Sequence, residues 1–159
     1  MEYFFNFEKI NYLKGKRPEG CILCHLCAGD GQASDTVVYR SAFNAVSVNL
    51  YPYNPGHLLI FPLRHIRDIR ELGGEERNDL DLLLNRALDV LDKNYTPSAY
   101  NTGFNMGLNA GASIDHLHMH VIPRYPHELG VAELLGGKRV LVENPDLTVK
   151  KLRQAFSLP

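Results

Sequence analysis

The segment "DHLHMHVIPR", residues Asp115 to Arg124, carries a histidine at every second position. Side chains alternate between the two faces of a β-strand, so His116, His118 and His120 would share one face while the apolar residues between them pack on the other. Same-face neighbours lie about 7 Å apart, close enough for hydrogen-bonded coupling or a shared ligand. The pattern leaves three interpretations open: a polar strand face, zinc ligands, or a nucleophilic histidine with supporting groups.

A group of cysteines precedes the histidines. Cys21 and Cys24 have the two-residue gap of half a zinc site, which is a weak signal on its own. Cys24 and Cys27 offer a competing pair, and His25 is an extra donor. No cysteine lies outside residues 21–27, which favours a reducing compartment over a disulfide scaffold, so we expect a cytoplasmic protein.

Length and composition restrict the class of protein. A chain of 159 residues with 45% hydrophobic and 22% charged residues is typical of one soluble globular domain. A net charge of −1 without a basic run excludes non-specific binding to nucleic acid or anionic membranes. No apolar stretch has the length of a membrane span, and the N-terminus does not resemble a signal peptide. We expect a single domain over 1–159, with an N-terminal extension at 1–20 and a tail with a helix at 126–159.

The predicted elements follow from periodicity. "TVVYRS", "FNAVSVNL" and "HLLIFPL" are β-rich runs, the first two separated by a turn near Ser41, and a loop, "GDGQASD", precedes them. Leucines from Leu80 to Leu91 form the apolar stripe of a long helix that begins near acidic residues. "YNTGFNMGLN" and "HLHMHVIPR" are two further strands, and a last helix begins at Pro145. This order predicts an α+β fold: an antiparallel sheet with a helix packed on one face.

"HLHMHVI" fits the pattern His-φ-His-φ-His-φ-φ, with φ hydrophobic, and the chain therefore resembles the histidine triad (HIT) superfamily of nucleotide hydrolases and transferases. "NPGHLLIFPLRH" is similar to the family's strand before the long helix, "NMGLNAGAS" to the loop before the triad, and "CILC" to many prokaryotic members. These motifs span most of residues 20–125. The resemblance implies the HIT fold, a five-stranded antiparallel sheet with a long helix packed on it and a C-terminal helix, and it implies a homodimer.

The resemblance also assigns roles to the histidines. It implies that His118 is the nucleophile, which attacks the α-phosphorus of an adenine nucleotide and forms a nucleotidyl-histidine that water or phosphate then resolves. His120 would be a phosphate-side or leaving-group partner, and His57 would lie close to the triad. The chain looks most like the bacterial members that hydrolyse or phosphorolyse diadenosine tetraphosphate.

Three further positions match the sugar and base contacts of the family. Asn49 resembles an Asn or Asp that bonds the ribose hydroxyls, although an asparagine that forms a turn before "YPYNPG" would look the same. Phe43 and Leu50 are candidates for the base pocket, and packing in the core explains each of them equally well.

Phosphate-binding positions lie just before the triad. By resemblance, Asn105 lies near the phosphate and Ser113 bonds a phosphate oxygen, while Gly111 and the amides around Ala112 could form an anion-binding concavity. Ala112 stands where many members carry a glutamine that contacts the leaving group. That difference leaves room for an alternative function, a nucleotide-binding or sensing protein with little turnover.

The resemblance completes the zinc site as well. In zinc-bearing members the ligands are the two cysteines, the histidine that ends the "PLRH" run and the first histidine of the triad. Here they correspond to Cys21, Cys24, His65 and His116, a closed site of structural type. His118 would then remain free for chemistry.

Overall fold

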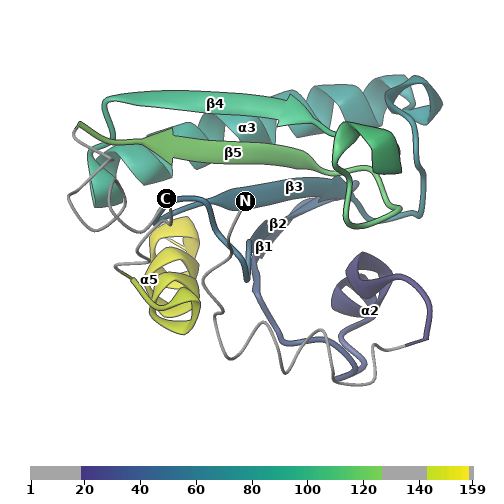
Figure 1. The fold of residues 1–159 in the computed structure, drawn as a ribbon, viewed down its shortest axis with the longest axis horizontal. Helices are drawn as coiled ribbons and strands as arrows, with labels where there is room; N and C mark the ends of the chain where they lie inside the picture. The colour runs from purple at the N-terminus through teal and green to yellow at the C-terminus, as the bar shows by residue number, and fades with distance from the viewer. Residues whose placement is uncertain (1–18, 127–142, 158–159) are drawn as a thin grey trace.

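The computed structural model describes residues 19–126 and 143–157, and within them the chain forms one five-stranded sheet with helices on both faces (Figure 1). The strand order is β1-β2-β3-β5-β4, and every neighbouring pair is antiparallel. The predicted sheet is therefore confirmed. Its strands are β1 (Val37–Arg40), β2 (Asn44–Val48), β3 (Leu58–Pro62), β4 (Ala99–Phe104) and β5 (Met119–Arg124).

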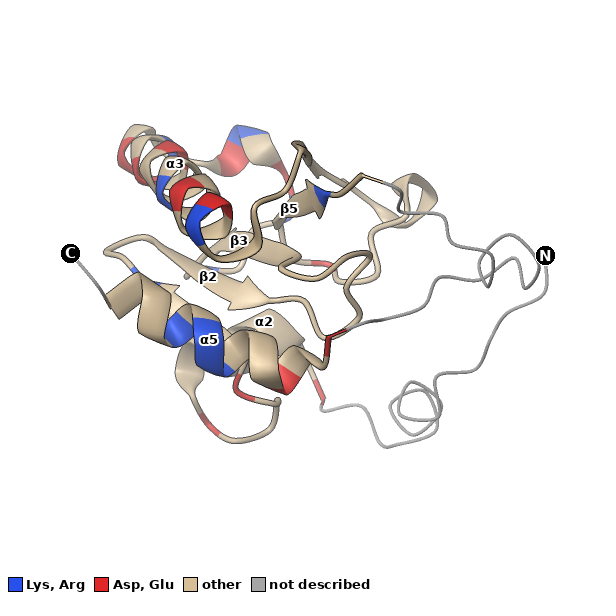
Figure 2. Ribbon diagram, turned by 90° about the vertical axis from the view of Figure 1, so that its left-hand side faces the viewer, with Lys and Arg blue, Asp and Glu red and all other residues tan. Residues whose placement is uncertain are grey.

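Two helices cover one face of the sheet. The long helix α3 (Gly74–Tyr95) contacts the sheet as predicted. The C-terminal helix α5 (Pro145–Ser157) was also predicted, and it contacts both the sheet and α3. The predicted stripe of α3 meets strand residues such as Val46 and Ile60 in the main core. Acidic and basic positions recur along α3 and α5 (Figure 2), which is the pattern expected of helices with one face in solvent.

The main core confirms the predicted facing of the triad. Leu117, Met119 and Val121 all belong to it, together with residues of α3 and α5. His120 alternates with Met119 and Val121 on the strand and therefore points to the opposite face of the sheet.

That opposite face carries a helix that was not predicted, α2 (Ile22–Ala28). Its buried Leu23 and Leu26 pack on Ala45, Leu59 and Phe61, forming a second, smaller core. Seven residues are too few for a recognisable periodic pattern, and α2 packs against strand residues that are distant in the sequence.

Two of the predicted boundaries are wrong. The strand expected over "YNTGFNMGLN" ends at Phe104, because Gly107 adopts a φ of 87° and the 3-10 turn η2 (Leu108–Ala110) follows. β5 begins only at Met119, so His116 and His118 precede the strand.

Another 3-10 turn, η1 (Ile69–Glu71), precedes α3. The predicted extension at 1–20 lies outside the described residues except for 19–20, and the tail is described only at 126 and 143–157.

A glycine lets the loop before β3 approach α3. Gly56 has a φ of 79°, and a Cβ on it would lie 3.0 Å from Cδ2 of Leu91 and 3.3 Å from Cδ2 of Tyr95. An L side chain would be strained in this backbone region and would clash with the helix. The next residue is His57, so this close approach helps to place a histidine of the site.

Candidate active site and metal centre

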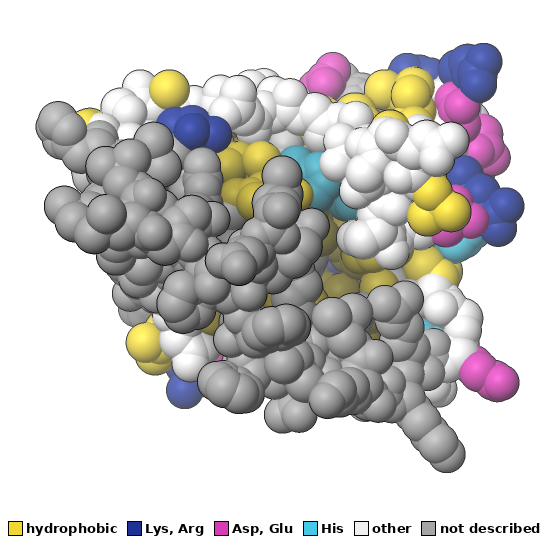
Figure 3. All heavy atoms as spheres, viewed as in Figure 1, with side chains coloured by type: hydrophobic (Ala, Val, Ile, Leu, Met, Phe, Trp, Pro, Cys, Tyr) yellow, Lys and Arg dark blue, Asp and Glu magenta, His cyan; other side chains and the backbone are white. Residues whose placement is uncertain are grey.

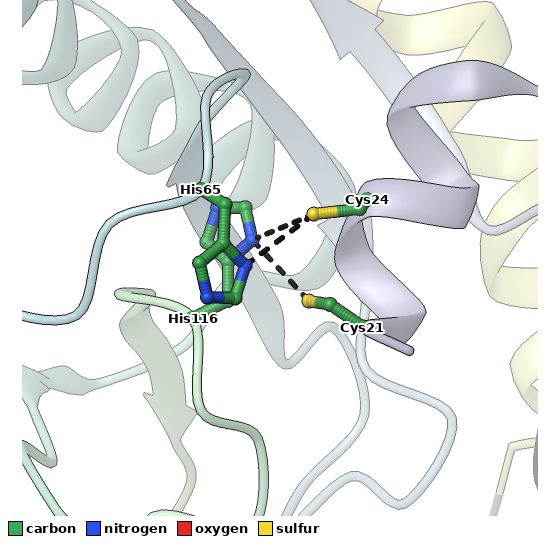
Figure 4. A group of neighbouring side chains, drawn as sticks. All are labelled: Cys21, Cys24, His65 and His116. Carbon is green, nitrogen blue, oxygen red and sulfur yellow. Dashed lines mark hydrogen bonds between the residues drawn. The ribbon is translucent and has the colours of Figure 1, made fainter. Parts of the chain in front are cut away.

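Four predicted metal ligands converge between α2 and the sheet (Figure 4). The ligand atoms of Cys21, Cys24, His65 and His116 all lie within 4.8 Å of one another. Nδ1 of His116 lies 3.4 Å from Sγ of Cys21 and 3.6 Å from Sγ of Cys24, while Nδ1 of His65 lies 3.4 Å from Sγ of Cys24. Cys21 immediately precedes α2 and Cys24 lies within it, while His65 lies in the loop after β3 and His116 in the segment before β5.

These separations suit a tetrahedral metal ion. Zinc bonds to sulfur and imidazole nitrogen imply ligand-to-ligand distances of about 3.3–3.8 Å in a tetrahedron. Nε2 of His116 is 2.9 Å from the Pro62 carbonyl oxygen, which only accepts, so this nitrogen carries the proton and Nδ1 faces the thiols with its lone pair. Ligating histidines commonly donate their second N–H to a carbonyl in this way. The four residues can therefore hold a metal ion.

Protonation at the cluster also matters for binding. Burial lowers the pKa of His116 to about 4, so its imidazole is neutral and can ligate at pH 7. Partial burial and the neighbouring Cys21 thiol raise the pKa of Cys24 to about 11. A metal ion must displace that proton, which makes metal affinity dependent on pH.

The alternative ligands His25 and Cys27 lie outside the cluster. The ring of His25 is already bonded at both nitrogens, with Nδ1 2.7 Å from Oδ2 of Asp30 and Nε2 2.8 Å from the Glu19 carbonyl oxygen. Cys27 packs against the smaller core. Among the described residues, the competing pair therefore does not assemble a site.

The middle histidine of the triad is oriented by the backbone. His118 is buried, and its Nδ1 lies 2.7 Å from the carbonyl oxygen of His116. Because that oxygen can only accept, Nδ1 carries the proton and donates it. Nε2 of His118 is left with a lone pair, which is the form an imidazole needs in order to act as a nucleophile.

His57 and His120 form a second oriented pair. The Tyr53 amide donates to Nδ1 of His57 over 3.1 Å, so the His57 proton lies on Nε2 and is donated to Nδ1 of His120 over 3.0 Å. His120 must therefore carry its own proton on Nε2. Burial, reinforced by His120 and His118, lowers the pKa of His57 to about 3, and burial with His118 lowers the pKa of His120 to about 4. Both rings are therefore neutral at pH 7.

A cavity of about 320 Å³ opens beside His120. On the face seen in Figure 3, histidine side chains lie next to hydrophobic ones. Asn49 has the contacts of a turn residue and also lies at the site. Its Oδ1 accepts a hydrogen bond from the Tyr51 amide in a turn, and its Nδ2 lies 3.3 Å from Nδ1 of His57. The predicted residues that line the cavity are Asn49, Leu50, Asn105, Gly111, Ser113 and His120.

The predicted catalytic residues His57 and His118 are buried and do not line the cavity; their ring centroids lie 5.2 and 4.9 Å from that of His120, which does. Two further predicted contributions are not brought to the cavity. Phe43 lies in the turn between β1 and β2 and is 36% exposed; it is absent from the cavity lining because it lies about 20 Å along the strand from Asn49. The Ala112 amide donates to the Gly107 carbonyl over 3.3 Å, so it is not available to an anion.

Other residues of the site were missed by the sequence interpretation. The Tyr53 ring stacks on His57, with centroids 5.3 Å apart, while Thr36 and Ser47 line the cavity with Leu23 and Leu26 of α2. Alternation along β2 could have indicated Ser47, because it lies two residues before Asn49 on the same face. The residues of α2 carried no such signal.

Comparison with known proteins agrees with this geometry. A curated relative, the AP-4-A phosphorylase of Mycobacterium tuberculosis, is 36% identical over 106 residues, which are 66% of this chain and 54% of that protein. The asymmetrical bis(5'-nucleosyl)-tetraphosphatase of Schizosaccharomyces pombe is 38% identical over 88 residues, 55% of this chain and 48% of that one. The chain therefore spans about half the length of these curated relatives.

The fold is shared with solved structures. A Zn-bound histidine triad family protein from Mycobacterium smegmatis superimposes with a TM-score of 0.69 at 21% identity, over 87% of this chain and 94% of the other. The family model described as the HIT domain matches residues 30–127, which include the sheet, α3 and all three histidines of the triad. Together with the oriented triad, this match shows that the chain belongs to the HIT domain family.

Proposed function

We propose that this protein cleaves adenine dinucleotide polyphosphates, such as diadenosine tetraphosphate, at the α-phosphorus through a nucleotidyl-histidine on His118. The observation that carries the proposal is the 2.7 Å hydrogen bond from Nδ1 of His118 to the His116 carbonyl, which leaves Nε2 with the lone pair of a nucleophile. The His118 ring lies 4.9 Å from the ring of His120, which lines the cavity. The names of the Mycobacterium tuberculosis and Schizosaccharomyces pombe relatives support this substrate class.

The proposed first step needs only groups of this chain. The Nε2 lone pair of His118 forms a bond to phosphorus while the bond from phosphorus to the bridging oxygen breaks, and the nucleoside polyphosphate, ATP in the case of diadenosine tetraphosphate, departs with that electron pair. Nδ1 keeps its proton, so the positive charge of the phosphorylated imidazole is stabilised by the His116 carbonyl. His120, protonated on Nε2, donates a hydrogen bond to the phosphate or the departing oxygen.

In the second step an oxygen of water or of inorganic phosphate forms a bond to phosphorus. The phosphorus–nitrogen bond breaks, its electron pair returns to Nε2 of His118, and an attacking water releases a proton to solvent. Asn49 would hold the ribose, Asn105, Gly111 and Ser113 the phosphates, and Leu50 the base, since all of them line the cavity.

Product analysis tests this proposal. Diadenosine tetraphosphate should yield AMP and ATP in water alone, or ADP and ATP when inorganic phosphate is the acceptor. His118→Ala should abolish both products while leaving AMP binding nearly intact. A wild-type protein with its metal bound that turns over no adenine nucleotide would contradict the enzymatic proposal.

Ala112 supports a second candidate, a nucleotide-binding or sensing protein with little turnover. Its side chain is a buried methyl group, which cannot donate to a leaving group. If the wild-type protein and His118→Ala bind AMP equally and neither releases product, the binding function is the correct one.

We propose that the cluster of Cys21, Cys24, His65 and His116 holds a structural zinc ion. The tetrahedral distances support it, as does the likeness in fold to a protein described as Zn-bound. When bound, zinc would cross-link α2 to the loop after β3 and to the triad segment. Metal analysis should give one zinc per chain, lost in Cys21→Ser and kept in His118→Ala; loss in both would instead make the whole triad a metal site.

We further propose a homodimer that pairs through α3 and the neighbouring β4, because β4 is an edge of the sheet and its side chains are largely exposed. Light scattering during size-exclusion chromatography would give the mass of a single chain if this proposal is wrong.

We also propose one domain over 1–159 and a cytoplasmic location. The three free thiols support the location. Among the described residues, no helix has both the length and the hydrophobicity needed to cross a membrane.

A further inference from the structure

Ser47 has a hydroxyl group that is buried without a hydrogen bond. The residue lies on β2 and is 1% exposed, and its Oγ has no partner among the described residues. Buried hydroxyls are nearly always paired, because leaving one unpaired costs free energy. An unpaired hydroxyl therefore points to a partner beyond the described residues, such as a bound ligand.

Ser47 lines the same cavity as His120. Its neighbours across the sheet are apolar, Val37 on β1 and Leu59 on β3. Leu23 and Leu26 of α2 form another part of the lining. A flat apolar group with a polar edge would fit these surroundings, its faces against the leucines and its edge at the hydroxyl.

The register of the sheet relates Ser47 to the reacting groups. Ser47 is directly opposite Leu59, and Leu59 is directly opposite His120, so the three side chains form a row on one face. Adjacent strands are about 4.8 Å apart, which separates Ser47 from His120 by about 10 Å. A nucleoside 5'-phosphate is about as long from its phosphorus to the far edge of its base. Asn49 follows Ser47 on the same face, where a sugar between the two ends can reach it.

We propose that Ser47 determines base specificity by hydrogen-bonding the polar edge of the nucleobase, an adenine in the substrates considered above. This inference rests on the proposed nucleotide site and adds the group that recognises the base. A hydroxyl both donates and accepts, so it can pair with an amino group or with a ring nitrogen of a purine. The bound base supplies the partner that Ser47 lacks among the described residues.

Ser47→Ala separates this role from a structural one. Removing an unpaired buried hydroxyl should leave the unliganded protein equally stable or make it more stable. Affinity for AMP should nevertheless fall about 2- to 12-fold, the usual worth of one neutral hydrogen bond. Affinity for ribose 5-phosphate, which has no base, should not change. If Ser47 were only structural, its replacement by alanine would lower the stability of the protein and the affinity for both ligands together.

The experiment is calorimetric titration of AMP and ribose 5-phosphate into the wild-type protein, Ser47→Ala and Ser98→Ala, with thermal unfolding of each protein. Ser98 is the matched control, because its hydroxyl is bonded to the Arg124 carbonyl and does not line the cavity. If Ser47→Ala binds AMP as tightly as the wild-type protein, or loses as much affinity for ribose 5-phosphate as for AMP, the role of Ser47 is refuted while the proposed nucleotide site stands. A wild-type protein that binds no AMP overturns the nucleotide site as well.

Discussion

Nε2 of His57 lies 3.0 Å from Nδ1 of His120, and this contact joins the loop before β3 to β5. The direction of the hydrogen bond is set by the backbone, since the Tyr53 amide already occupies Nδ1 of His57. His120 is thereby kept with its proton on the nitrogen that is free to meet a phosphate. The orientation of the outer histidine of the triad thus depends on a residue far from it in the sequence.

Replacing His57 should therefore lower kcat through His120. His57→Leu removes the donor to His120, and we expect kcat to fall about 10- to 100-fold with little change in KM, less than a direct acid–base group would contribute. His57→Gln should retain more activity, because its amide N–H can still donate. Steady-state kinetics on diadenosine tetraphosphate checks both variants, and wild-type kcat in His57→Leu would refute the coupling.

The lowered pKa values of His57 and His120 make stability depend on pH. Above their ordinary value of 6.5 both rings are neutral in the folded and unfolded chain. Below it the unfolded chain binds protons that the folded protein excludes, so the free energy of unfolding falls as pH falls from about 6.5 towards about 4. The slope is at most about 1.4 kcal/mol per pH unit for each histidine.

Urea unfolding between about pH 7.5 and pH 5 measures this slope. The carboxyl groups of Asp68 and Glu76 have pKa values lowered to about 2, so the stability they contribute is lost at a lower pH. His57→Gln should show a shallower slope than the wild-type protein over the same range. Equal slopes would mean that His57 is not held neutral in the folded state.

Removing the metal should destabilise the protein and weaken nucleotide binding. Zinc bound at the proposed site would hold α2 against the sheet, and α2 supplies Ile22, Leu23 and Leu26 to the cavity. A metal present at about 1,000 times its dissociation constant stabilises by about 4 kcal/mol, so a chelator should lower Tm by about 10 °C. The Kd for AMP should rise in the same sample.

Cys24→Ser should reproduce the effect of the chelator, whereas Cys27→Ser should not, because Cys27 lies outside the cluster. Differential scanning calorimetry and AMP titration with and without chelator provide the measurements. If the chelator lowers Tm but leaves the affinity for AMP unchanged, then α2 does not contribute to AMP binding.

Gly56→Ala should be destabilising by about 1–3 kcal/mol. The substitution places a Cβ 3.0 Å from Leu91 in a backbone conformation with positive φ. Gly74→Ala is the matched control, since a Cβ there meets nothing within 4 Å and alanine favours the start of α3. Chemical unfolding of both variants tests this, and equal stabilities would show that the loop can move away from α3.

Local patterns in the sequence were enough to predict the main elements. The leucine spacing of α3, the proline that begins α5 and the alternation that separates the triad from Leu117, Met119 and Val121 were all confirmed. Each of these patterns reports a backbone geometry with a period of two or about 3.6 residues, which the chain expresses within one element.

The tertiary structure alone decided which distant groups meet. Cys21 and His116 are 95 positions apart, and their contact depends on how α2, a helix with no periodic signal, packs against β3. A backbone carbonyl or a neighbouring ring decides which nitrogen of each triad histidine carries the proton. The row from Ser47 to His120 follows from the register of the strands. Residue type and spacing determined which side chains were available for chemistry; long-range packing determined their partners and their proton positions.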